Sequence, residues 1–202
     1  MNRTSDPTPE PAATAPEFPP ESPEAEVVRL RAEVARLEQQ VAALEILADR
    51  DPLTTIFNRR AFMRELNRVV GFCERYQTTA AVVFFDMDAF KGINDVFGHA
   101  AGDAALQAVA ATLASHVRES DVVGRLGGDE FAVILVQVDR SAAQAKADSL
   151  KQRIEASPAI HDGMAVPLRV SHGLRMFEPG ITAAGLLAGA DAAMFLNKPP
   201  TR

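Results

Sequence analysis

The 202-residue sequence lacks several features that would assign it to particular classes of protein. No apolar run reaches the roughly 18 residues that a membrane-spanning helix needs, and no basic segment followed by an apolar stretch opens the chain. A single cysteine, Cys73, excludes an intramolecular disulfide framework. We therefore expect a cytoplasmic protein that works without a membrane.

Positive charge is also scarce. The chain has 21 Lys/Arg against 27 Asp/Glu, and most of the acidic excess lies in residues 1–50, where five basic residues face ten acidic ones. Because a nucleic-acid-binding surface needs clustered basic residues, we expect no nucleic-acid partner. Any phosphate-bearing ligand must be bound by small local clusters. The 47% hydrophobic and 24% charged content is otherwise ordinary for a globular protein.

The first part of the chain, residues 1–23, holds seven of the thirteen prolines, and Phe18 is its only large apolar side chain after Met1. Such a segment buries too little surface to offset the entropy lost on ordering. We predict a disordered tail.

Residues 24–50 change to a strict 3-4-3-4 apolar spacing. The spaced positions are Val27, Leu30, Val34, Leu37, Val41, Leu44 and Ala48. Val at the first and Leu at the second position of each heptad favours a parallel two-stranded coiled coil. An amphipathic helix packed on its own domain is the alternative. We predict a homodimer through residues 24–50.

Residues 51–202 have the pattern of one α/β (α+β) domain. The periodicity predicts helices over 58–76, 90–97, 102–118, 141–156 and 182–197, and strands over 79–86, 121–126, 129–136 and 168–177. Gly127-Gly128 suits the positive φ angles of a tight hairpin turn between the second and third strands. This order elaborates a βαββαβ pattern, with helices covering one or both faces of a sheet that contains antiparallel strands.

Acidic residues stand at two strand ends. Asp86 and Asp88 close the apolar run over 79–86, and Asp129 and Glu130 follow the glycine pair. If the two strands are neighbours, Asp86 and Asp129 face each other and would need a cation such as Mg²⁺. Lys91 lies one helical turn beyond Asp88, within reach of the same phosphates. The alternative is that Asp86 and Asp88 cap the next helix and Asp129 is a turn residue; for Asp88 we favour capping.

The segment RLGGDEF (125–131) resembles the signature of the GGDEF family, the diguanylate cyclases. Other family motifs follow in the family's order and spacing over residues 51–202. They are DPLT (51–54), NRR (58–60), FFDMDAFKGINDVFGHAAGD (84–103), RESD (118–121) and ADAA (190–193) with Lys198. The resemblance implies a nucleotide-cyclase-like sheet flanked by helices.

The resemblance also implies an activity, the condensation of two GTP into cyclic di-GMP with release of two pyrophosphates. By position in the motif, Asp86, Asp129 and the backbone carbonyl of Met87 would hold two Mg²⁺ ions, or Mn²⁺. Asp129 would assist deprotonation of the attacking hydroxyl, with Glu130 in support. Lys91 would neutralise the triphosphate.

The resemblance also implies substrate-binding roles for further residues. Lys198 and Arg202 match triphosphate-binding positions, although Pro199 and Pro200 interrupt the family's pattern there. Asn94 and Asp103 would recognise guanine, because a carboxylate can accept from guanine N1–H and N2–H₂ together. His99 would line the same pocket, or make only a structural hydrogen bond.

Two regulatory features are implied. Each domain would bind one GTP, so two domains must face each other, and a coiled-coil dimer would bring them together. Arg118 and Asp121 match the family's product-binding inhibitory site, and Arg125 could belong to the same patch. The alternative is an exposed Arg118–Asp121 ion pair worth ~0.3 kcal/mol. Ser149 stands where some members carry an arginine that cross-links two domains.

Departures from the family keep other functions open. Thr55-Ile56-Phe57 replaces the usual Gly-Leu-Pro, and His172 stands where an apolar residue normally enters the sheet. One alternative is a weak or inactive domain that acts as a receptor for cyclic di-GMP or GTP. Another is a coiled-coil scaffold. We expect assembly, product concentration or an upstream regulatory protein to set the activity.

Overall fold

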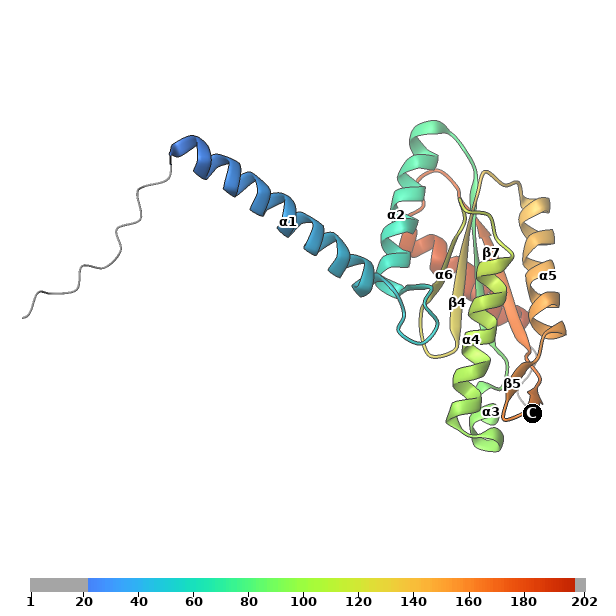
Figure 1. The fold of residues 1–202 in the computed structure, drawn as a ribbon. Coiled ribbons are helices and arrows are strands. Elements are labelled where there is room, and N and C mark those ends of the chain that lie inside the picture. Colours follow the sequence, from blue (N-terminus) through green and yellow to red (C-terminus); the bar gives the residue numbers. More distant parts are fainter. Residues whose placement is uncertain (1–21, 199–202) are drawn as a thin grey trace, which may run out of the picture. The chain divides into compact units, whose positions relative to one another are not determined.

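The structure is a computed structural model that describes residues 22–198, without the side chains of residues 41–47 (Figure 1). The chain divides into two compact units, residues 1–45 and 46–202. Nearly all of the segment predicted to be disordered lies outside the described residues, as does the predicted phosphate-binding Arg202. The side chains of Val41 and Leu44 in the predicted seam are also outside them.

Helix α1 (Pro23–Asp49) covers the segment with heptad spacing. It begins after Ser22, whose hydroxyl accepts a hydrogen bond from the backbone N–H of Ala25 at 3.2 Å. Four large seam side chains are between 45% and 53% exposed: Val27, Leu30, Val34 and Leu37. This row of apolar side chains is available to a partner helix. Within residues 22–198, no helix combines the length and the apolar character that crossing a bilayer requires.

The second unit is built on a five-stranded sheet of order β1-β3-β4-β2-β7. Its strands are β1 (Phe57–Asn58), β2 (Ala80–Met87), β3 (Val122–Arg125), β4 (Glu130–Val136) and β7 (Val170–Met176). A separate hairpin joins β5 (Ala159–His161) to β6 (Met164–Val166). The helices are α2 (Arg59–Tyr76), α3 (Phe90–Phe97), α4 (His99–Ser115), α5 (Arg140–Ala156) and α6 (Ala183–Asn197). The predicted mixed α/β fold is confirmed.

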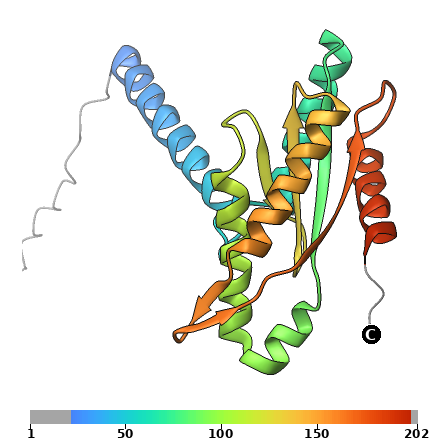
Figure 2. The same cartoon turned by 90° about the vertical axis from the view of Figure 1, so that its right-hand side faces the viewer.

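The central strand β2 separates two hydrophobic cores. It pairs antiparallel with β4 on one side and with β7 on the other. Its side chains alternate between the two faces, so that Val83 and Phe85 pack in the core under α4 and α5, and Val82 and Phe84 pack in the core under α2 and α6. Figures 1 and 2 show these helix pairs on opposite faces of the sheet. Burial on both faces explains why residues 79–85 are almost wholly apolar.

The structure corrects several predicted details. The predicted helix over 102–118 begins earlier, at His99. Gly98, with φ +86°, separates it from the preceding helix α3. The β3–β4 turn is closed by a 2.8 Å bond from the Leu126 N–H to the Glu130 carbonyl, but Gly127 and Gly128 do not take the predicted positive φ angles.

The short strands of the second hairpin were missed by periodicity. Its turn holds Asp162 at φ +48° and Gly163 at φ +75°. Asp-Gly is a strong hairpin signal, but β5 and β6 have only three residues each, too few to show alternation.

Candidate functional site

The end of β2 and the start of β4 bring the predicted metal-binding carboxylates together. Asp86 is the register partner of Glu130, and the Met87 N–H donates to the Asp129 carbonyl at 3.1 Å. Burial and the charge of Asp86 raise the pKa of Asp129. Burial and the charges of Asp129 and Asp86 raise the pKa of Glu130. Carboxylates this close repel one another when charged, and a bound cation would relieve that repulsion.

The donor set fits a hard divalent cation. Across residues 22–198, no cluster of three or more His, Cys, Asp or Glu side chains forms a complete metal cage. Two neighbouring carboxylates with a backbone carbonyl fit Mg²⁺, which binds through one or two carboxylates and takes further ligands from water and substrate phosphates. Asp86, Asp129 and the Met87 carbonyl could provide such a partial shell.

Asp88 does not cap the following helix, contrary to the prediction. The N-cap of α3 is Ala89, which has φ +55° and makes no side-chain capping bond. The carboxylate of Asp88 instead accepts a hydrogen bond from Ser171 Oγ at 2.8 Å, and its N–H donates to the Arg169 carbonyl at 2.9 Å. Ala89 takes the N-cap position between the strand and the helix, and Asp88 bonds toward β7 instead.

One of the two predicted phosphate-binding lysines that the structure describes contacts these acids. Lys198, at the C-terminal cap of α6, hydrogen-bonds through Nζ to Asp86 Oδ1. Burial lowers the pKa of Lys198, but the bond to Asp86 and the charges of Asp86, Asp88 and Asp129 outweigh it and raise the pKa overall. Lys91 is exposed in the first turn of α3.

The predicted guanine-binding residues gather where α3 meets α4. Asn94 lies against the α4 backbone: a Cβ on Gly102 would come 2.0 Å from Asn94 Oδ1. Asp103 follows Gly102 and is exposed, and His99 opens the same helix, also exposed. The glycine is therefore needed for the close approach of Asn94 to the turn of α4 that carries Asp103.

The glycine turn that carries Asp129 is held by Arg125. Its Nε donates to the Gly127 and Gly128 carbonyls at 3.1 and 3.2 Å, and its Nη2 donates to the Gly128 carbonyl at 2.7 Å. Its Nη1 pairs with Asp51 Oδ1 at 3.0 Å. We call these four contacts, which join Asp51, Arg125 and the glycine turn, the turn clamp.

Asp51 is itself fixed within the DPLT motif. Its Oδ1 accepts from the Thr54 N–H at 2.9 Å and from Thr54 Oγ1 at 2.7 Å. Burial opposes the charge, but these bonds and Arg125 hold the pKa of Asp51 below its ordinary value. Arg125 is thus engaged in the turn clamp. The sequence suggested that it could belong to the patch of Arg118 and Asp121, but it is not among the residues that line their pocket.

The pocket of Arg118 and Asp121 has a volume of about 370 Å³ and lies between the C-terminal end of β4 and α5. Arg118, Asp121, Lys146 and Ser149 are among its lining residues. The Asp121 carboxylate accepts from the Arg118 N–H at 3.0 Å and from the Val136 N–H at 3.2 Å. Backbone bonds therefore orient this acid, and it stands beside two cationic side chains.

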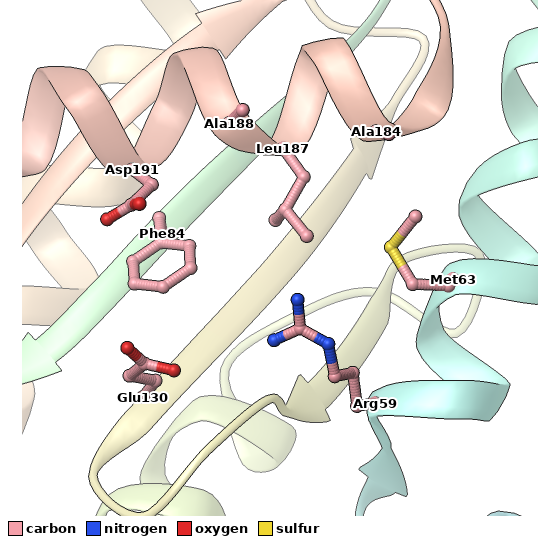
Figure 3. A pocket seen from close by; sticks show the side chains of 8 residues that line it. All are labelled: Arg59, Met63, Phe84, Glu130, Ala184, Leu187, Ala188 and Asp191. Atoms are coloured by element: carbon pink, nitrogen blue, oxygen red, sulfur yellow. The ribbon is translucent and has the colours of Figure 1, made fainter.

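A pocket of about 340 Å³ borders Glu130 on the other face of the sheet (Figure 3). Arg59 from α2, Glu130 from β4 and Asp191 from α6 project into it over Phe84 and Leu187. Arg59 also donates to the Leu126 carbonyl at 3.3 Å. The charge of Asp191 helps to raise the pKa of Glu130, and that of Arg59 lowers it. The sequence assigned no role to Arg59 or Asp191; their only signal was their place in the NRR and ADAA motifs.

Known proteins share this domain. Residues 48–202 match the family described as "Diguanylate cyclase, GGDEF domain". The chain is 39% identical over 157 residues to diguanylate cyclase TpbB of Pseudomonas aeruginosa, covering 77% of this chain and 36% of TpbB. It is 35% identical over 125 residues to the probable diguanylate cyclase DgcT of Escherichia coli, covering 62% of this chain and 27% of DgcT. The chain thus spans about a third of the length of these relatives.

Solved structures agree with this likeness. The coiled coil and GGDEF domain of DgcB from Caulobacter crescentus, in complex with c-di-GMP, align with a TM-score of 0.76 at 29% identity, covering 87% of this chain and 93% of that one. Diguanylate cyclase SiaD in complex with its activator SiaC, from Pseudomonas aeruginosa, aligns with a TM-score of 0.74 at 28% identity, covering 85% and 66%.

Proposed function

Because the chain belongs to the diguanylate cyclase GGDEF-domain family, we propose that it condenses two GTP molecules into cyclic di-GMP and releases two pyrophosphates. The observation that carries the proposal is the closeness of Asp86 and Asp129 at adjoining strand ends, beside Lys198. A receptor or a scaffold has no need of carboxylates crowded so that the charge of Asp86 raises the pKa of Asp129 and of Glu130. The cyclase uses them.

The reaction joins a ribose 3′-oxygen to the α-phosphorus of the facing GTP and breaks the bond to the β-phosphate. Bound Mg²⁺, held by Asp86, Asp129 and the Met87 carbonyl, would neutralise phosphate oxygens and favour ionisation of the hydroxyl. Asp129 would assist removal of the hydroxyl proton. Glu130 follows it in the chain, and burial and the charges of Asp129 and Asp86 raise its pKa.

The remaining residues bind and orient the nucleotide. Lys91 and Lys198, with Arg202, balance the charge that moves onto the leaving pyrophosphate. Asn94 and Asp103 accept the guanine donors at the α3–α4 junction, with His99 at its rim. Adenine lacks the paired N1–H and N2–H₂ donors, so this pair selects GTP.

Assembly follows from the need for two facing sites. We place the division at residues 1–23 as a tail, 24–50 as a coiled-coil helix and 51–202 as the cyclase domain, with α1 pairing to a second copy through its exposed seam. The likeness to the coiled-coil structure of DgcB supports this division. Two linked domains would meet at about millimolar effective concentration.

Product inhibition is assigned to the pocket of Arg118 and Asp121. A guanidinium suits a phosphate or the Hoogsteen edge of guanine, and a carboxylate suits its donors. Lys146 adds a second cation, whereas Ser149 offers no guanidinium for a second domain. An upstream activator, as in the complex of SiaD with SiaC, is a further regulator that this likeness suggests.

Chromatography of the products from GTP and Mg²⁺ tests the proposal. We expect the native chain to form cyclic di-GMP and Asp129→Asn to lose at least about a hundredfold in rate, as for loss of a general base. Asp162→Asn makes the same chemical change in the exposed β5–β6 turn and should keep the native rate. No product from the native chain, together with cyclic di-GMP binding that Arg118→Ala abolishes, would instead establish a receptor.

A further inference from the structure

Lys198 occupies a cation position beside the proposed metal ligands. Its Nζ hydrogen-bonds to Asp86 Oδ1, and the two side chains are 32% and 13% exposed. Asp88 and Asp129 add to the negative field at this ammonium. The contact therefore satisfies Asp86 within the protein, at the point where a divalent cation would otherwise be needed.

The position of Lys198 is set by the end of α6. The Asn197 side chain donates from Nδ2 to the His172 carbonyl of β7 at 3.2 Å. Beside this bond α6 packs directly on β7, because a Cβ on Gly173 would come 2.0 Å from the Met194 nitrogen. Strand β7 in turn pairs with β2, where Ser171 is the register partner of Asp86. Asn197 thus fastens the helix end to the strand next to the carboxylate.

We propose that Lys198 is the internal counter-ion of Asp86 in the nucleotide-free protein, that Asn197 positions it there, and that a divalent cation binds tightly only when a triphosphate draws the ammonium away. This inference rests on the proposed function, since it assigns Asp86 to the metal and Lys198 to the triphosphate. It adds that tight metal binding depends on bound nucleotide, because in the nucleotide-free site the ammonium competes with the metal ion.

The physical reason is competition between two cations for one carboxylate. A charge-assisted hydrogen bond must be broken before Asp86 can bind a metal ion, and an ammonium left nearby repels that ion. A triphosphate offers the ammonium a new anionic partner and so removes both obstacles. By linkage, the metal then increases the affinity for nucleotide by the same factor as nucleotide increases the affinity for metal.

Binding of Mn²⁺ to the full chain without nucleotide, followed by electron paramagnetic resonance of the free ion, tests the inference. We expect Lys198→Met to bind Mn²⁺ about tenfold more tightly than the native chain, the loss of one charge-assisted hydrogen bond. Asn197→Ala should give a smaller gain in the same direction. Lys151→Met removes the same charge from α5, where Lys151 pairs with Glu155 at 3.7 Å, and should leave Mn²⁺ binding unchanged.

The result that overturns the inference is a Lys198→Met protein, folded by circular dichroism, whose Mn²⁺ affinity equals or falls below that of the native chain. Lys198→Gln provides a second variant if Lys198→Met fails to fold. Asp86→Asn in the same assay should abolish the tight binding. The outcome is separate from the proposed function: a chain that forms no cyclic di-GMP can still show the tighter Mn²⁺ binding, and an active cyclase can lack it.

Discussion

At the scale of single residues, the site places acids where the fold alone would not favour them. Asp129 and Glu130 lie partly buried near Asp86. Burial and the charge of Asp86 raise the pKa of Asp129, and burial and the charges of Asp129 and Asp86 raise that of Glu130. Each such shift is a free-energy cost of holding the charged form in the folded chain. Lys198 hydrogen-bonds to Asp86 through Nζ. The charged form of Asp129 therefore opposes folding.

A pH-dependent gain in stability follows for Asp129→Asn. Because the folded-state pKa of Asp129 lies above its ordinary value, the folded chain holds more protons between the two values, and the free energy of unfolding falls as pH rises through them. At pH 7 without metal we expect the variant to have a higher free energy of unfolding and a higher Tm than the native chain. Near pH 3 Asp129 is protonated in both the folded and the unfolded native chain, so the gain should vanish.

Urea unfolding of the two proteins at pH 7 and pH 3 in a chelator provides the measurement. Asp162→Asn, at an exposed turn, should change neither value. An Asp129→Asn protein less stable than the native chain at pH 7 would contradict the expectation.

At the scale of elements, the turn clamp connects two segments that lie far apart in the sequence. Arg125 and Asp51 are 14% and 18% exposed, and they tie residues 51–54 to the glycine turn before β4. The same entry segment is anchored a second time, because Asp49 pairs with Arg64 at 2.6 Å and with Arg60 at 3.2 Å. The start of the domain therefore bears directly on the turn that carries Asp129.

Replacing Arg125 by lysine should separate substrate binding from turnover. A lysine has one ammonium and cannot reach two carbonyls and a carboxylate with the fixed geometry of a guanidinium. We expect Arg125→Lys to lose about 2 kcal/mol of stability and most of the rate of product formation. The KM for GTP should change little, because Asn94 and Asp103 stand on other elements.

The matched control is Arg68→Lys on α2, whose pair with Glu65 lies on the surface and should contribute less than about 1 kcal/mol. Thermal unfolding and steady-state kinetics of both variants decide the point. Equal losses in kcat and in GTP affinity for Arg125→Lys would show that the clamp supports the whole domain and not the turn.

At the scale of the whole molecule, the proposed reaction requires two copies of the chain. The described seam residues of α1 are half-exposed within one chain, as an unpaired coiled-coil helix would be. Truncation would also remove contacts of the domain itself. A chain starting at Asp51 would lose Asp49, the partner of Arg64, and Ala48, whose carbonyl accepts from Asn58 at 2.6 Å. Point variants are therefore a cleaner test than truncation.

We expect Leu30→Glu/Leu37→Glu to be monomeric and to form cyclic di-GMP much more slowly at low micromolar protein, since free domains meet rarely. The control, Ala32→Glu/Gln39→Glu, adds the same charge on the side of the heptad away from the seam and should stay dimeric and active. Sedimentation and turnover measured over a range of protein concentrations provide the test. Full activity of a monomeric seam variant would contradict a role for α1 in assembly.

The sequence by itself determined the elements and the chemistry available to them. Alternation and apolar runs placed β2 and α6 to within a residue or two, because burial on a helix or strand leaves a local period. The carboxylates at the ends of strands and the family motifs identified the candidate site. Local patterns also supported the α1 helix, which the structure contains.

Tertiary structure decided the partners. The Asp86–Lys198 contact and the Arg125–Asp51 contact join residues 112 and 74 positions apart, and neither pairing has a local period. Both depend on the strand order β1-β3-β4-β2-β7, which brings chain entry, glycine turn and helix end to one edge. Asp88 turned from the predicted cap toward Ser171 for the same reason. A side chain can bond only to groups that the folded sheet brings close to it. Local sequence patterns do not show which distant residues those are.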